Sequence, residues 1–342
     1  MRPMQDAGPS GIRGAPATSS VTEEVRQARA DMAHALQTAL ADLEAMVAAN
    51  ADPAAAGFPI KELDRRLAPL LIAAENWRNP GLNLIALHSD TAEEPEIAEY
   101  PLVKGSWNTQ AFIESADSGR YVALLDNGQH TRAAHILKEG RDVSVLVVDS
   151  LRLNQPEQDY EDYAVSLKED FGPGARLAFI PLDLQKSAYG CRVFSISLAL
   201  KMHARADLFG QMHEALSRDA DPAPGMPQMR DTPDEGAFVI LQAGPLVDAG
   251  MMKHAESQTS LRRYLLANPG QGHLAVNKRH ETLAERMERH RVARTVVQQS
   301  KAKQVAFSNS IEHKRIALLR RALDYVQAAP ADHVVRLAPL LH

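Results

Sequence analysis

Apolar residues recur at spacings of three or four positions in the first eighty residues of the chain. This spacing is typical of a helix with one buried face. It predicts one helix over residues 22–48, on Val25, Met32, Leu36, Leu40 and Leu43. A second helix is predicted over residues 61–77, and Asn79-Pro80-Gly81 ends it.

The pattern changes after Gly81 to short apolar runs bounded by turn residues. Turn signals at 126–128 and 138–140 separate consecutive runs, which predicts neighbouring strands of a mainly antiparallel sheet. The five runs cover residues 82–87, 121–125, 133–137, 143–148 and 177–180. Strands together with helices place the chain in the α+β or mixed α/β class.

Helical spacing returns in the second half of the chain. Helices are predicted from Cys191 to Lys201 or beyond, and over residues 207–216, 257–266, 281–299 and 311–326. Residues 217–236 contain four prolines, two glycines and four aspartates, so we expect an exposed loop or linker there.

Charge divides the chain more sharply than its net value of −5 suggests. Residues 253–321 hold 15 lysines and arginines against five acids, a net of +10, whereas residues 1–252 carry −14. No apolar run approaches 18 residues, so no membrane span is expected. The single cysteine excludes a disulfide framework and a cysteine-cluster zinc site, and we expect no metal.

Composition and pattern together suggest five parts. Residues 1–20, rich in Pro, Gly and Ser, lack the apolar stretch of a signal peptide and are expected to form a disordered leader. A helical segment (21–78), a core that contains the predicted sheet (79–236), a basic helical module (237–328) and a tail (329–342) follow. The candidate residues and the resemblance given below make the 79–236 part the expected catalytic core.

The sole cysteine, Cys191, follows Gly190 and opens an apolar helical segment. A thiol in the first turn of a helix lies near its positive end and its unpaired N–H groups, which favour the reactive thiolate. The same placement is also typical of a small residue in a hydrophobic core.

Three polar residues are candidate partners of this thiol. His130 follows a predicted turn, and Asp149 ends the next predicted strand, so a hairpin would bring the two side by side. Gln185, six residues before Cys191, is a candidate amide donor to an oxyanion. As isolated residues, Asp149 is also typical of a strand end and Gln185 of a polar loop.

The order His130, Asp149, Gln185, Cys191 resembles that of cysteine enzymes of the ubiquitin-like-protease type. Within that group the chain resembles the YopJ family of type III secreted effector acetyltransferases. The similarity extends from about residue 79 onwards. It rests on Asn79-Pro80-Gly81-Leu82-Asn83-Leu84, Asn127-Gly128-Gln129-His130, Val145-Leu146-Val147-Val148-Asp149, Asp183-Leu184-Gln185, Gly190-Cys191, Phe194-Ser195, Lys253-His254, Ser260-Leu261-Arg262-Arg263-Tyr264-Leu265, Val276-Asn277-Lys278-Arg279-His280-Glu281-Thr282 and Lys314-Arg315-Ile316.

Three positions depart from the family pattern. Asp149 stands where many members have Glu, although some have Asp. Thr131 replaces an apolar or aromatic residue, and Arg192 replaces a frequent Gly, which changes the surroundings of the imidazole and of the oxyanion.

The resemblance implies an α+β fold, with a papain-like catalytic core, a mixed sheet and a helical regulatory module. It also implies acetyl transfer from acetyl-CoA through Cys191 to Ser, Thr or Lys of host proteins such as kinases or immune regulators. His130 would act as the base, Asp149 would orient it, and Gln185 would stabilise the oxyanion. Two alternatives stay open: a cysteine protease of ubiquitin-like conjugates, and a non-catalytic effector that binds host targets.

The basic module admits several interpretations. A solvated helical surface is one; nucleic-acid binding is another, although aromatic residues for stacking are few. The resemblance implies an inositol hexakisphosphate site and makes Lys253 a candidate for autoacetylation. One helix face would carry Arg286, Arg289, His290 and Arg294. The other candidates are Lys278, Arg279, His313, Lys314 and Arg315, with contributions from Lys61, Arg65, Arg66 and Arg78.

The resemblance also implies where the protein acts. An effector of this type is secreted by a bacterium and reaches the host cytoplasm or nucleus, and the Pro/Gly/Ser leader would serve as the secretion signal.

Overall fold

A computed structural model of the chain describes residues 17–53, 56–88, 106–152, 156–217, 238–241, 247–298 and 301–341. Residues 1–16 of the predicted leader and nearly all of the predicted linker lie outside these ranges. The remaining leader residues, 17–20, are the first turn of helix α1 (Ala17–Ala48). No helix in the described ranges is both long and apolar enough to cross a membrane.

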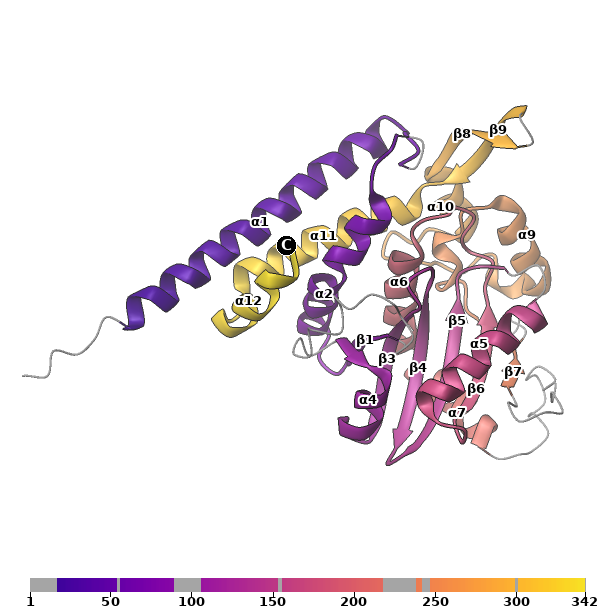
Figure 1. Cartoon of the computed structure of the whole chain (residues 1–342). Coiled ribbons are helices and arrows are strands. Elements are labelled where there is room, and N and C mark those ends of the chain that lie inside the picture. Colours follow the sequence, from indigo (N-terminus) through magenta and orange to yellow (C-terminus); the bar gives the residue numbers. More distant parts are fainter. Residues whose placement is uncertain are drawn as a thin grey trace, which may run out of the picture.

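A seven-stranded mixed sheet forms the centre of the molecule (Figure 1). Its strand order is β2-β1-β3-β4-β5-β6-β7. The strands are β1 (Leu84–His88), β2 (Ser106–Asn108), β3 (Gly119–Asp126), β4 (Thr131–Glu139), β5 (Asp142–Asp149), β6 (Arg176–Pro181) and β7 (Phe238–Ile240).

The sheet is antiparallel only in its middle. The two predicted turns join β3 to β4 and β4 to β5, and these two pairs are antiparallel. The pairs β1–β2, β1–β3, β5–β6 and β6–β7 are parallel. The prediction of a mainly antiparallel sheet was therefore wrong outside the hairpins, because helix α5 (Pro156–Phe171), which the apolar pattern did not reveal, connects β5 to β6 as a crossover.

Helices cover both faces of the sheet, and apolar residues of alternating strand positions meet them. On one face, α4 (Thr109–Ser115) and α5 pack against residues such as Leu125, Val147 and Phe179. On the other face lie α6 (Cys191–Ala204), α7 (Ala206–Ser217) and α2 (Ile60–Arg78).

The N- and C-terminal helices lie against each other outside this layer. Helix α1 packs along α11 (Ser310–Ala328), and α12 (Ala331–Leu337) lies beside both (Figure 1). The segments predicted as separate parts share one hydrophobic core, which includes Leu36, Val193, Tyr264 and Leu318. Strand β7, placed in the basic module by the sequence, is part of the central sheet.

The basic third is less helical than predicted. Helices α9 (Gln258–Ala267) and α11 agree with the prediction, but the expected helix over 281–299 was wrong. Instead, α10 (Leu283–Arg289) ends at His290, and β8 (Arg291–Gln298) pairs with β9 (Lys301–Ser308) in a separate hairpin. The β-branched residues Val292, Thr295, Val296 and Val297 favour a strand. Arg294 therefore does not share a helix face with Arg286.

Short 3-10 turns cover Met252–His254, Pro269–Gln271 and Ala338–Leu341.

Candidate active site

Cys191 is the first residue of helix α6, after a glycine in a left-handed conformation. Gly190 has φ of 95°, a value that L-residues with a side chain rarely adopt. A Cβ at that position would lie 3.4 Å from Nη2 of Arg315. The turn thus requires glycine, and it delivers the thiol at the positive end of a largely buried helix.

The tight turn between β3 and β4 positions His130. Oδ1 of Asn127 accepts hydrogen bonds from the backbone N–H of Gln129 (3.2 Å) and His130 (2.8 Å). Oδ1 of Asp126 accepts one from the N–H of Gly128 (3.0 Å), whose φ is +80°. Side chains within the turn therefore hold the backbone that presents the imidazole.

Asp149, fully buried at the end of β5, orients the imidazole. Its Oδ1 lies 2.9 Å from Nε2 of His130 and accepts a bond from the N–H of Leu151 (2.9 Å). Its Oδ2 accepts a bond from Nε of Arg132 (2.8 Å). With Nε2 directed at the carboxylate, Nδ1 of His130 is the nitrogen that remains for Cys191.

The two reactive groups shift each other's ionisation. Burial would lower the pKa of His130, but hydrogen bonds to Asp149 and Cys191 raise it from 6.5 to about 9. Burial would raise the pKa of Cys191, but the hydrogen bonds to His130 and to the backbone of Thr131 lower it. This arrangement favours a thiolate–imidazolium pair at neutral pH.

Arg192 connects the nucleophile to the histidine turn. Its guanidinium pairs with Oδ2 of Asp126, and both side chains are largely buried. This bond joins residues 66 positions apart, so no local sequence pattern predicts it. The position that departs from the family pattern therefore ties α6 to the turn that carries His130.

Gln185 orders the loop before Cys191 and does not extend an N–H towards it. Its Nε2 donates to the backbone oxygens of Ser187 (2.8 Å) and Tyr189 (3.1 Å), and its Oε1 accepts from Oγ of Ser150 (2.9 Å). Both amide hydrogens have backbone partners, so this structure supports a positioning role in place of the expected oxyanion contact. The N–H groups in the first turn of α6 are the donors nearest the thiol in sequence.

Glu256, which the sequence analysis missed, supports the same loop from the basic third. Its carboxylate accepts from the backbone N–H of Lys186 (2.5 Å) and of Ser187 (2.7 Å) and from Oγ of Ser187 (2.8 Å). Burial raises the pKa of Glu256 to about 6, although these N–H bonds act against the rise. The loop that precedes the nucleophile is therefore held by a residue outside the predicted catalytic core.

Several cations of the basic third converge in a second, half-buried cluster. Burial, followed by the charges of Lys201, Arg286 and Arg321, lowers the pKa of Lys253 to about 8. Burial, followed by the charges of Arg321 and Lys253, lowers that of Lys314 well below its usual range. Glu75 acts in the opposite direction on Lys314, but its carboxylate already pairs with Arg321 at 3.0 Å.

The remaining basic candidates are distributed differently. Arg315 is buried and pairs with Asp64 through two bonds of 2.7 and 2.9 Å, and buried Arg294 bonds Glu312 and Tyr189. In this structure neither is presented to a ligand. Arg289 pairs with Glu281 at 2.5 Å. Arg289 is exposed, as are Lys278, Arg279 and His313 and, on the early helix α2, Lys61, Arg66 and Arg78. Lys201 and Arg321, which join the cluster, had not been singled out.

No group of three His, Cys, Asp or Glu residues in the described ranges is arranged to hold a metal ion. The reactive groups around Cys191 are its own thiol, the imidazole of His130 and the carboxylate of Asp149. Such a set carries out nucleophilic acyl transfer or hydrolysis.

Comparisons with solved structures show the same fold. The structure described as "AvrA delL154 with IP6, CoA" has a TM-score of 0.60 at 23% identity and covers 85% of this chain and 98% of its own. That of "HopZ1a in complex with IP6 and CoA" has a TM-score of 0.62 at 19% identity, with 88% and 98% covered. Both likenesses confirm the α+β architecture.

Sequence comparisons match proteins of the same kind. YopJ of Yersinia pestis, a serine/threonine-protein acetyltransferase, is 24% identical over 238 residues, which is 67% of this chain and 73% of that protein. HopZ1a of Pseudomonas syringae pv. syringae, with the same description, is 23% identical over 281 residues, 77% and 74% of the two chains. The model of the family described as YopJ Serine/Threonine acetyltransferase matches residues 32–321, so the chain belongs to this acetyltransferase family.

Proposed function

We propose that this chain transfers an acetyl group from acetyl-CoA, through a thioester on Cys191, to a Ser or Thr hydroxyl or a Lys amine of a host protein. The observation that carries the proposal is the 2.9 Å contact between His130 and buried Asp149, beside a thiol whose pKa is lowered at the start of α6. Family membership supplies the acyl donor.

In the first half-reaction, the Cys191 thiolate attacks the carbonyl carbon of acetyl-CoA. The tetrahedral oxyanion is stabilised by N–H groups in the first turn of α6. When the carbon–sulfur bond to CoA breaks, the proton on His130 passes to the departing thiolate, leaving acetyl-Cys191 and free CoA.

In the second half-reaction, neutral His130 removes a proton from the acceptor as the acceptor attacks acetyl-Cys191. Collapse of the tetrahedral species returns the Cys191 thiolate, and His130 keeps the proton. Asp149 holds the ring orientation through both steps.

The half-buried cluster of Lys253, Lys314, Lys201, Arg286 and Arg321 fits inositol hexakisphosphate as the activator. Its cations repel one another, and a polyphosphate supplies the negative charge that relieves this repulsion. The cluster is connected to the segment that carries Glu256, because Nε of Arg286 donates to the backbone oxygen of Lys253 (3.0 Å), three residues before Glu256. Ordering this cluster would thus support the Cys191 loop.

Lys253 is also the proposed site of autoacetylation. With its pKa lowered to about 8, a larger share of its amine is unprotonated at neutral pH than for an ordinary lysine. The unprotonated amine is the nucleophilic form. We further propose that the protein is secreted by its bacterium into a host cell, where its targets lie.

A transfer assay tests the proposal. Wild type, Cys191→Ala and the control Ser217→Ala are incubated with radiolabelled acetyl-CoA, with and without inositol hexakisphosphate, and protein-bound label is counted. Label should appear in wild type and in the control, increase with the polyphosphate, and be absent from Cys191→Ala. Cleavage of a ubiquitin-like conjugate without any labelling would instead identify a cysteine protease.

A further inference from the structure

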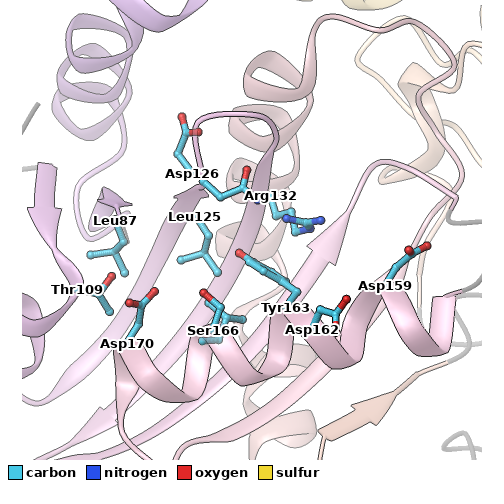
Figure 2. A pocket seen from close by; sticks show the side chains of 12 residues that line it. Leu87, Thr109, Leu125, Asp126, Arg132, Asp159, Asp162, Tyr163, Ser166 and Asp170 are labelled. Atoms are coloured by element: carbon cyan, nitrogen blue, oxygen red, sulfur yellow. The ribbon is translucent and has the colours of Figure 1, made fainter. Parts of the chain in front are cut away.

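A cleft of about 390 Å³ lies between helix α5 and the ends of strands β3 and β4 (Figure 2). Asp159, Asp162 and Tyr163 line it from α5, and Asp126, Asn127 and Arg132 line it from the opposite wall. The mechanism above uses none of the α5 residues. Asp159 and Asp162 are three positions apart and therefore project from one side of the helix.

The cleft adjoins the candidate active site through two of its lining residues. Arg132 donates to Asp149, the partner of His130. Asp126 pairs with Arg192, the neighbour of Cys191. A molecule in the cleft would therefore touch the groups that hold the catalytic pair in place.

The unneutralised charge of the cleft is negative. The charges of Asp126 and Arg132 are matched by their partners Arg192 and Asp149. Asp159 and Asp162 are exposed and enter no salt bridge within the described part of the chain. The cleft thus repels anions, such as CoA or nucleic acid, and attracts cationic groups.

Arg132 adds a feature that acidic residues alone lack. The residue is 8% exposed, and its guanidinium carbon lies 4.0 Å from the centre of the Tyr163 ring. Arg132 is a lining residue of the cleft, and its Nη1 is buried without a hydrogen-bond partner among the described residues. A buried, unpaired N–H donor is costly, so it calls for an acceptor atom from outside. Figure 2 shows the guanidinium of Arg132 beside the ring of Tyr163.

We infer that this cleft docks the acceptor protein through a segment that carries a Lys or Arg close to the acetylated residue. The cationic side chain would pair with Asp159 and Asp162, and a backbone carbonyl oxygen of the same segment would accept from Nη1 of Arg132. A peptide supplies both the cationic side chain and the carbonyl acceptor, whereas a metal ion cannot accept a hydrogen bond from Arg132. The inference rests on the proposed function and adds the substrate class.

Peptide binding and acetylation, measured separately, test the inference. Three fluorescein-labelled peptides share one Ser acceptor and differ only in its flanking residues, which are Lys, Gln or Glu. Binding is followed by fluorescence anisotropy, and transfer by the kcat/KM of each peptide. The variant Asp159→Asn/Asp162→Asn is compared with Glu161→Gln/Glu169→Gln, which removes two exposed acids of the same helix that do not line the cleft.

Wild type should bind the Lys peptide about fivefold more tightly than the Gln peptide, the size expected of one or two partly exposed ion pairs. The cleft variant should lose this preference and the control should keep it. Asp159→Lys/Asp162→Lys should prefer the Glu peptide. Acetylation of Cys191 itself should be unchanged in all variants.

Equal binding of the Lys and Gln peptides by wild type would overturn the inference, as would an equal loss in the control variant. A protein that never forms acetyl-Cys191 would contradict the proposed function. Anisotropy does not require turnover, so the peptide-binding result would still test the docking inference by itself.

Discussion

The hydrogen bond between Cys191 and His130 contributes to the pKa shifts of both side chains. The hydrogen bonds of His130 raise its pKa to about 9 against the effect of burial, and the imidazolium in turn lowers the pKa of the thiol. At neutral pH the pair therefore holds one proton, on nitrogen, and the sulfur is the nucleophile.

This ionisation predicts a pH profile for alkylation. Because Cys191 is the only cysteine, iodoacetamide reports on this thiol alone. Wild type should react rapidly well below the pKa of about 8.5 of an ordinary thiol, and His130→Ala should shift the profile up to that range. An unchanged profile in His130→Ala would show that His130 does not activate the thiol. His273→Ala, which removes an exposed histidine, serves as the control.

Arg132 is a positioning residue for the same pair. It is one of the charged partners that hold Asp149 in place. Arg132→Gln should slow acetylation of Cys191 about tenfold, since a hydrogen bond to a charged group is worth about 1.5–3 kcal/mol. Because the charge of Arg132 opposes that of the imidazolium, the variant should also raise the pKa of His130 further. Arg132→Lys should recover part of the rate; a rate equal to that of wild type in Arg132→Gln would refute the role.

At the scale of elements, the start of α6 is fixed against the β3–β4 turn by the Asp126–Arg192 pair. Asp126→Asn and Arg192→Gln should each lower the rate of Cys191 acetylation, and the double variant should be no slower than the worse single variant, because the pair acts as a unit. The exposed pair Glu44–Arg320 is the matched control, and its variants should leave the rate unchanged. Additive losses in the Asp126/Arg192 cycle would contradict the coupling.

Helices α2 and α11 are joined by the buried pair of Asp64 and Arg315, which lies beside Gly190. Asp64→Ala should lower the free energy of unfolding by about 3–5 kcal/mol, because the Arg315 charge stays buried without a partner. Asp64→Leu/Arg315→Met should recover most of this loss. Urea denaturation measures both; a loss below about 1 kcal/mol in Asp64→Ala would show that the charge finds another partner.

Local signals predicted the elements that carry the catalytic residues. The Asp126-Asn127-Gly128 turn, the apolar run ending at Asp149 and Gly190 before Cys191 all specify backbone shape within a few residues. Contacts over long separations left no such signal. Arg192 with Asp126, Arg315 with Asp64 and Glu256 with the 186–187 backbone depend on the tertiary arrangement.

The hairpin β8–β9 was missed for a related reason. Its charged residues fit a helical surface as well as a strand, and only its pairing with a second strand, from Arg291 with Ser308 to Gln298 with Lys301, makes the extended form stable. Arg294, predicted on a helix face, instead reaches Glu312 and Tyr189 from that strand.

Across the whole molecule, the acidic and the basic parts of the chain each contribute one charged site, and both parts share one hydrophobic core. The acidic part contributes the cleft beside α5, and the basic part contributes the cluster around Lys253 and Lys314. The first suits a cationic acceptor and the second a polyanion, so one chain attracts two oppositely charged partners at separate places.

The self-repulsion of the basic cluster predicts how stability depends on pH. The pKa of Lys253 is about 8 in the folded chain and near 10.5 when unfolded, so the unfolded state binds more protons between these values. The free energy of unfolding should therefore receive a rising contribution from Lys253 as pH increases from 8 to 10.5. Lys253→Met should remove this contribution, whereas Lys278→Met, at an exposed lysine, should not.

Inositol hexakisphosphate should reduce the same contribution by stabilising the charged lysines. Thermal denaturation across this pH range, with and without the polyphosphate, checks both expectations. A slope unaffected by Lys253→Met would show that the lysine is not held in a repulsive cluster.

Mass spectrometry of the protein after exposure to acetyl-CoA and inositol hexakisphosphate shows whether Cys191 carries the acetyl group during transfer. One acetyl group is expected on the peptide that contains Cys191; neutral hydroxylamine should remove it, as it removes a thioester, and His130→Ala should strongly reduce it. Acetylation of acceptors that persists in Cys191→Ala, with no thioester in wild type, would contradict this role of Cys191.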